Sequence, residues 1–262
     1  MDIQVFSTLA FSIFGLLFGS FANVCVHRIP RRESVVSPGS KCPHCHKNIV
    51  WYDNIPVISW LLLKRKCRYC KNPISWRYPM LELSMALIWG LIAWHYPLTP
   101  YPSLFFIQAL VLVSMLWVLT LIDLETFLLP DVITLPGIVI GLLFAWQAGY
   151  IIDATLGALI GYAVFWLVAR MFLLTTGREG MGQGDFKLLA MLGAFMGWQA
   201  LPFIILLSSV TGAIIGSVSL IVAKKGLQTE IPYGPYLAAA GIIWFFWAEP
   251  ILHWYQAIIM GT

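Results

Sequence analysis

The sequence contains few charged residues. Asp, Glu, Lys and Arg make up 11% of its 262 residues, whereas 60% of the residues are hydrophobic. An ordinary soluble domain carries about 25% charged residues, so this composition excludes a water-soluble globular protein and a disordered chain. The net charge of +4 is too small to argue for nucleic acid as a partner. The composition therefore predicts an all-α polytopic membrane protein.

Apolar runs long enough to cross a bilayer recur along the chain. A spanning helix needs about 20 apolar residues, with a range of about 17–25. Runs of this kind lie at 5–26, 80–96, 103–122, 132–149, 152–174, 201–223 and 236–258. The stretch 186–198 is apolar but short, so it either crosses where the membrane is thinned or forms a re-entrant half-helix. We count it as a span, which predicts about eight transmembrane helices.

The basic residues indicate which ends of these helices face the cytoplasm. Eleven of the 16 Lys and Arg residues lie between Arg28 and Arg77, and the other five flank the loops 175–185 and 224–235. With eight spans, all three segments fall on one face, which the positive-inside rule makes cytoplasmic. Without a crossing at 186–198, Lys224 and Lys225 would change sides. The charge distribution therefore favours eight spans.

Four of the five cysteines lie within 29 residues, in the only sizeable polar segment of the chain, residues 28–79 (the insert). They form two CxxC pairs, Cys42 with Cys45 and Cys67 with Cys70. Two such pairs favour a closed, structural zinc site in a small, zinc-ribbon-like insert. Two disulfides and a redox site are the alternatives. His44 and His46 are alternative ligands, although solvated loop positions are the simpler interpretation. Cys25 stands apart in an apolar span, where a buried inert thiol is expected.

Several acidic residues gather at the predicted inner ends of membrane helices. Ionisable groups at membrane depth are costly and mark functional sites. Asp123 ends an apolar run, and Glu125 lies about 200° further round the same helix, so only one of them can face the helix bundle. Asp131 and Asp185 each stand where a helix is expected to begin, and an N-cap is the simplest interpretation of both. The glycine-rich stretch before Asp185 matches neither a P-loop nor a dinucleotide fingerprint.

Two aspartates at one membrane depth allow two kinds of chemistry. If Asp123 and Asp185 come together, one carboxylate can deprotonate a water while the other, still protonated, donates to a scissile carbonyl. That chemistry is acid–base peptide hydrolysis. Proton transport is the other common use of paired carboxylates in membranes, and these residues alone leave both possibilities open.

A series of motifs along the chain resembles a known family. The motifs are 19–24, 27–30, 77–82, 123–131, 182–185 and 231–236, together with the tetracysteine insert. In this order they resemble the type IV prepilin peptidases, a group of GxGD-type intramembrane aspartic proteases also called leader peptidases/N-methyltransferases. The resemblance covers essentially the whole chain. It divides the chain into a first transmembrane helix (1–27), a cytoplasmic zinc domain (28–79) and a peptidase core (80–262).

The resemblance implies an enzyme of type IV pilus or type II secretion systems. Such an enzyme cleaves the basic leader from prepilins or pseudopilins at the cytoplasmic membrane face. It then N-methylates the new N-terminal residue with S-adenosylmethionine. The resemblance also implies a bacterial inner membrane protein whose zinc domain and catalytic aspartates are cytoplasmic. Its partners would be the lipid bilayer and the pilin substrates, without nucleic acid.

The same resemblance assigns residues to the two reactions. It implies that the catalytic pair is Asp123 and Asp185. Residues in the same motifs would support the peptidase site: Gly182, Gly184, Lys187, Asp131 and Glu125. Glu82 is a candidate contact for the methyl donor or for the peptidase site, and a buried partner for Arg77 or Arg28 is its alternative role. A peptidase without methyl transfer and a proton-coupled transporter are the alternative functions.

Overall fold

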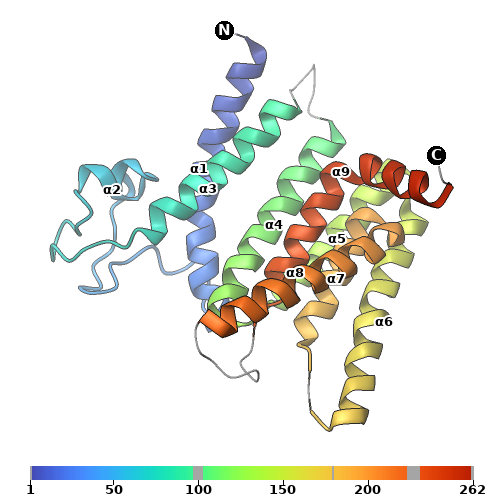
Figure 1. Cartoon of the computed structure of the whole chain (residues 1–262). Coiled ribbons are helices and arrows are strands. Elements are labelled where there is room, and N and C mark those ends of the chain that lie inside the picture. The colour runs from blue at the N-terminus through green and yellow to red at the C-terminus, as the bar shows by residue number, and fades with distance from the viewer. Residues whose placement is uncertain (1, 97–102, 179, 223–230, 261–262) are drawn as a thin grey trace. The chain divides into compact units, whose positions relative to one another are not determined.

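A computed structural model describes residues 2–96, 103–178, 180–222 and 231–260 of the chain (Figure 1). Within these residues the protein is nearly all helical and contains no strand, as predicted. The α-helices are α1 (Ile3–Arg28), α2 (Ile58–Leu62), α3 (Arg77–His95), α4 (Leu104–Thr126), α5 (Asp131–Ala148), α6 (Ile151–Thr176), α7 (Gln183–Met196), α8 (Leu201–Val222) and α9 (Gly234–Met260). Short 3-10 turns are η1 (Ile29–Arg31), η2 (Trp51–Asn54) and η3 (Trp198–Ala200).

Six helical segments in the described part of the chain are long and apolar enough to cross a membrane. They are Ile3–Arg31, Leu104–Thr126, Asp131–Ala148, Ile151–Thr176, Trp198–Val218 and Gly234–His253. The multi-pass helical architecture is therefore confirmed, whereas the count of eight spans is not. Neither α3 nor α7 is among the six, and α3 carries Arg77 and Glu82 in its first two turns. Lys224 and Lys225, which entered the charge argument, lie outside the described residues.

The chain divides into two compact units, Met1–Ser114 and Met115–Thr262. In the first unit α1 packs along α3 at close range. A Cβ on Gly19 would lie 2.7 Å from the Cα of Glu82, so the two backbones can approach only because this residue is glycine. The Asn23 side chain donates to the carbonyl of Tyr78 at 3.2 Å and joins the end of α1 to the start of α3. The predicted domain boundaries at 27 and 79 lie within this unit and stay a prediction.

In the second unit α7 is the central helix, and it packs against α5 and α6 (Figure 1). Its side chains are buried almost all round, and Leu188, Leu189 and Met191 have no exposed surface. The helix has 14 residues, which reach about 21 Å at 1.5 Å per residue, against about 30 Å for the hydrocarbon core. A helix that is apolar on every face can be buried by other helices, which explains why this short segment resembled a span.

Candidate metal centre and candidate active site

The two CxxC segments of the insert fold into turns of the same design. The backbone N–H of Cys42 donates to the carbonyl of Lys47 at 3.0 Å, and that of Cys67 donates to Asn72 at 2.9 Å. The next backbone hydrogen bond, further from the cysteines, also occurs at the same positions in both turns. In both turns the residue directly after the second cysteine has a left-handed backbone. The two CxxC segments therefore form a structural repeat, and each copy presents two thiols to the other.

The four cysteines of the two turns meet in one cluster, the tetracysteine cluster. Their sulfur atoms all lie within 4.8 Å of one another, and the Sγ atoms of Cys42 and Cys70 are 3.8 Å apart. A tetrahedral zinc ion with Zn–S bonds of about 2.3 Å places its sulfur ligands about 3.8 Å apart. All five cysteines of the chain are free thiols, so the disulfide alternative is wrong. His44 and His46 are exposed and stand outside the cluster.

Hydrogen bonds in the insert favour the charged forms of the Cys67 thiol and the Asp53 carboxyl. Backbone N–H groups of Cys70 and Tyr69 lower the pKa of the Cys67 thiol to about 6, because they donate to the sulfur and favour its charged form. The thiolate is the form that binds a metal. Beside it, Arg68 donates twice to Asp53, with both N–O distances at 2.6 Å. These hydrogen bonds hold the pKa of the Asp53 carboxyl below its usual range.

Two acidic residues singled out in the sequence come together in the second unit. Asp123 lies in the last turn of α4 and is 4% exposed, and Asp185 lies in the first turn of α7 and is 8% exposed. Leu129 links their surroundings, because it lies against Gly184, next to Asp185, and against Gly234, whose N–H bonds Asp123. Two neighbouring buried carboxylates cannot both ionise readily, so the arrangement favours a pair that shares one proton.

A residue to which the sequence assigned no role holds Asp123 in place. The backbone N–H of Gly234, at the start of α9, donates to Asp123 Oδ2 at 2.9 Å. A Cβ on Gly234 would lie 2.7 Å from that oxygen, so a larger residue would displace the carboxylate. The neighbouring Tyr233 hydroxyl shares a hydrogen bond of 2.8 Å with Ser208 Oγ, which fixes this loop against α8. The motif 231–236 was the available signal, although its residue types suggest no chemistry.

The glycine motif around Asp185 allows a close approach of the loop that follows α4. A Cβ on Gly184 would lie 2.7 Å from the Cβ of Leu129, and the side chain of Leu129 also lies against Gly234. The N-cap of α7 is Gly182, which already has the extended backbone of a cap. The interpretation of Asp185 as an N-cap is therefore wrong, because the helix starts two residues earlier.

The remaining acidic and basic residues of the two motifs have different surroundings. Asp131 is the first residue of α5, whose N-cap is Pro130, so the N-cap interpretation is wrong here too. Instead, the Asp131 carboxylate pairs with the Lys187 Nζ at 2.6 Å and joins α5 to α7. Glu125 is exposed while Asp123 is buried. The prediction that only one of these two residues faces the bundle is confirmed.

Glu82 belongs to the first unit and is 7% exposed. Its Oε2 accepts a hydrogen bond of 2.8 Å from the backbone N–H of Val57, and its carboxylate also bonds the side chain of Ser20. Through these contacts Glu82 joins the insert to α3 and α1. The structure thus brings Asp123, Asp185 and Gly234 together in one unit and holds Glu82 in the other.

These features define a class: a multi-pass helical membrane protein with a tetracysteine cluster in one unit and two buried aspartates in the other. Two known protein families match parts of the chain. Residues 13–96 match the bacterial peptidase A24 N-terminal domain, and residues 110–217 match the type IV leader peptidase family. The chain belongs to the type IV leader peptidase family.

Relatives that match nearly the whole chain carry the name prepilin leader peptidase/N-methyltransferase. The protein of Aeromonas salmonicida is 44% identical over 95% of this chain and 93% of its own length. That of Pseudomonas aeruginosa is 44% identical over 93% and 91%, and that of Neisseria gonorrhoeae is 38% identical over 93% of each. No solved structure gives a significant match to the chain.

Proposed function

We propose that this chain cleaves the basic leader from type IV prepilins or pseudopilins and then N-methylates the new N-terminal residue. The observation that carries the proposal is the pair of buried aspartates, Asp123 at the end of α4 and Asp185 at the start of α7. The name shared by the relatives supports both activities.

The proposed cleavage needs one ionised and one protonated carboxylate. The ionised member of the pair takes a proton from a water molecule, which attacks the scissile carbonyl, while the protonated member donates to the carbonyl oxygen. As the intermediate collapses, a proton passes to the leaving amine, so the products are a free leader and a mature pilin with a new amino terminus. The hydrogen bond from Gly234 holds Asp123 for this task.

The other residues of the two motifs support the pair. Gly184 lets the Asp185 turn lie against the loop after α4, Gly182 is the N-cap of α7, and the Lys187–Asp131 ion pair fixes α7 against α5. Glu125 stands on the exposed face at the end of α4, where its charge can attract a basic leader.

We further propose the bacterial inner membrane as the location, with the insert and the aspartates on the cytoplasmic side. The excess of basic residues in the insert supports this orientation. The tetracysteine cluster fits a structural zinc ion, since four thiolates leave no open coordination position. The proposed parts of the chain are a first transmembrane helix (1–27), the zinc domain (28–79) and the peptidase core (80–262).

For the second reaction, S-adenosylmethionine supplies an electrophilic methyl group on a positively charged sulfur. The methyl acceptor is the amino group that cleavage creates, and it must lose a proton to become a nucleophile. The chain therefore needs a second binding site, one that suits a positively charged, amino-acid-like molecule.

The cleavage proposal is tested with a prepilin that carries its leader, in proteoliposomes, with product masses read directly. Asp123→Asn and Asp185→Asn are each expected to lower the cleavage rate by roughly 10²–10⁴-fold, because an amide can neither take a proton from water nor share one. Asp153→Asn on α6 is the matched control, since its amide oxygen can still accept from Trp198. Cleavage by both variants at the wild-type rate would refute the aspartate pair.

A further inference from the structure

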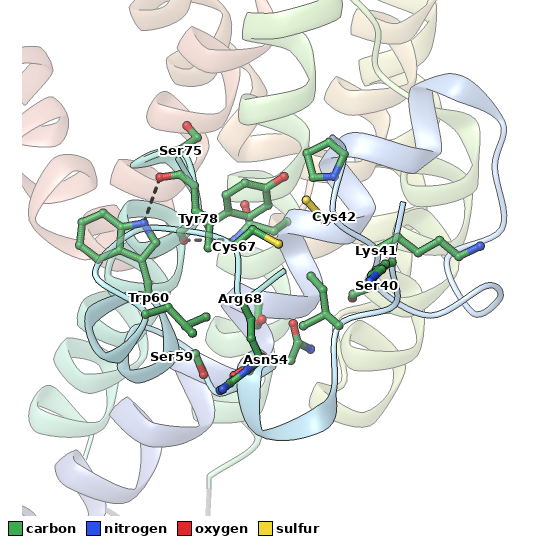
Figure 2. A pocket seen from close by; sticks show the side chains of 18 of the residues that line it. Ser40, Lys41, Cys42, Asn54, Ser59, Trp60, Cys67, Arg68, Ser75 and Tyr78 are labelled. Atoms are coloured by element: carbon green, nitrogen blue, oxygen red, sulfur yellow. Dashed lines mark hydrogen bonds and ion pairs between the residues drawn. The ribbon is translucent and has the colours of Figure 1, made fainter. Parts of the chain in front are cut away.

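A cavity of about 340 Å³ lies in the first unit, beside the tetracysteine cluster (Figure 2). Its walls come from α1, the insert and the start of α3, and they include Cys42, Cys67, Trp60 and Tyr78. Sites for small molecules usually have volumes of about 300–1,000 Å³. Neither Asp123 nor Asp185 lines this cavity, and both belong to the other unit.

A buried negative charge lines the cavity. Glu82 is 7% exposed, and the two groups that bond its carboxylate among the described residues, the Val57 N–H and the Ser20 side chain, are neutral. Burying a carboxylate without a compensating cation is unfavourable. The wall at Glu82 therefore suits a positively charged group of a ligand, whereas other walls carry basic side chains such as Arg28, Lys41 and Lys47.

A buried acceptor without a donor lines the same cavity. Asn23 is 6% exposed, and its Nδ2 donates to the carbonyls of Gly19 and Tyr78. Its Oδ1 is buried and has no hydrogen-bond partner among the described residues. Such acceptors are uncommon in folded proteins and are often completed by a bound group. Glu82 is close by, because its carboxylate bonds Ser20, which lies three residues before Asn23 on the same face of α1. Both side chains line the cavity, so together they suit an ammonium group.

We propose that this cavity binds S-adenosylmethionine, with Glu82 and Asn23 receiving its amino group. The inference rests on the methyl transfer proposed above and locates the donor site that this transfer needs. The ligand is an amino acid derivative with a positively charged amino group, which the two side chains match. The ring of Tyr78, which lines the cavity (Figure 2), offers a flat surface for the adenine base.

The other amine of the reaction, the new amino terminus of the pilin, fits Glu82 less well. This amine must be neutral when it attacks the methyl group. A neighbouring carboxylate favours the protonated form of an amine, so Glu82 would oppose the reaction if it held the acceptor. The amino group of the donor stays charged throughout the transfer, and a buried carboxylate stabilises it.

The test measures ligand binding to the full chain in detergent, with zinc present, by calorimetry. The ligands are S-adenosylmethionine, S-adenosylhomocysteine and 5′-methylthioadenosine, of which only the last lacks the amino acid portion and with it the α-amino group. The variant Glu82→Gln removes the charge but keeps an oxygen that can accept from Val57. Its Kd for the first two ligands is expected to rise about tenfold or more, because a hydrogen bond to a charged group is lost. Its Kd for 5′-methylthioadenosine is expected to stay the same.

The pattern across ligands separates a lost contact from a damaged fold. Equal weakening of all three ligands would mean structural damage and would overturn the assignment, as would unchanged binding of all three. Weakening of S-adenosylmethionine alone would place the sulfur, not the amino group, at Glu82 and overturn it too. The matched control is Glu33→Gln, an exposed acid of the insert, which is expected to bind all three ligands like wild type.

A second measurement distinguishes the donor from the acceptor. If Glu82→Gln raised the KM for a processed pilin peptide while the Kd for S-adenosylmethionine stayed unchanged, the cavity would hold the acceptor and the proposal would fail. A failure of the proposed function itself would give another result, because the wild-type chain would then neither release the leader nor add a methyl group to the product.

Discussion

The insert and the aspartate site are stabilised by different forces. The insert has two small turns, an ion pair and four clustered thiols that could hold a metal ion, while apolar side chains such as Val36 and Trp51 are exposed on it. The aspartate site includes the start of α7, whose Leu188 and Met191 are fully buried. It also includes glycines that neighbouring residues approach closely. The comparison implies that folding of the insert depends on its metal ligands, whereas the geometry of the aspartate site depends on close packing.

The strongest test of this difference is to remove one metal ligand. Cys42→Ser is expected to release zinc and unfold the insert, because metal binding contributes about 10–16 kcal/mol to the folding of zinc-finger peptides. Zinc content and limited proteolysis of the insert measure the effect, and leader cleavage is expected to change less than either. Cys25→Ala is the control, since Cys25 is a buried thiol of α1 outside the cluster. A metal-free Cys42→Ser protein with a protease-resistant insert would contradict this view.

The aspartate site is expected to respond to a single added methyl group. Gly184→Ala would place a Cβ 2.7 Å from Leu129 and push the Asp185 turn aside. A displacement of about 1 Å at a catalytic group can lower the rate about 10²-fold, and we expect a loss of this size in kcat/KM for leader cleavage. The double variant with Leu129→Ala is expected to recover part of it.

The matched control for this substitution lies in the insert. A Cβ on Gly39 would have no neighbour within 4 Å, so Gly39→Ala is expected to leave cleavage unchanged. If Gly184→Ala cleaved as fast as wild type, the site would not depend on the close approach to Leu129.

The sequence was sufficient for features that local patterns encode. Apolar content predicts membrane helices, and the CxxC spacing predicts the tetracysteine cluster, because each signal lies within a few dozen residues. It was insufficient where distant segments meet. The bond from Gly234 to Asp123 joins residues 111 positions apart, and although both lie in recognised motifs, neither motif indicates that the two residues meet. The central position of α7 and the pairing of Asp131 with Lys187 likewise depend on tertiary packing.

The smallest expected effects come from the two ion pairs, one in each region. In the insert, Asp53 is bonded twice by Arg68 and its side chain is 8% exposed, whereas the Asp131 side chain, paired with Lys187, is 56% exposed. Exposed pairs contribute about 0.2–1 kcal/mol, so Asp131→Asn is expected to lower the thermal unfolding midpoint slightly. Asp53→Asn is expected to lower it more, because two hydrogen bonds to a shielded carboxylate are weakened.

The pH and salt dependence of these two variants sharpen the comparison. The pKa of Asp53 is lowered in the folded protein, so its contribution is fully present above the unfolded value of about 3.9 and is lost as the pH falls through the folded value. At pH 7 the difference between wild type and Asp53→Asn is therefore complete. In 1 M salt, where the screening length is about 3 Å, the Asp131→Asn difference is expected to vanish and the Asp53→Asn difference to persist. Equal loss of both differences in salt would mean that the insert gains no more stability from its ion pair than the second unit gains from its own.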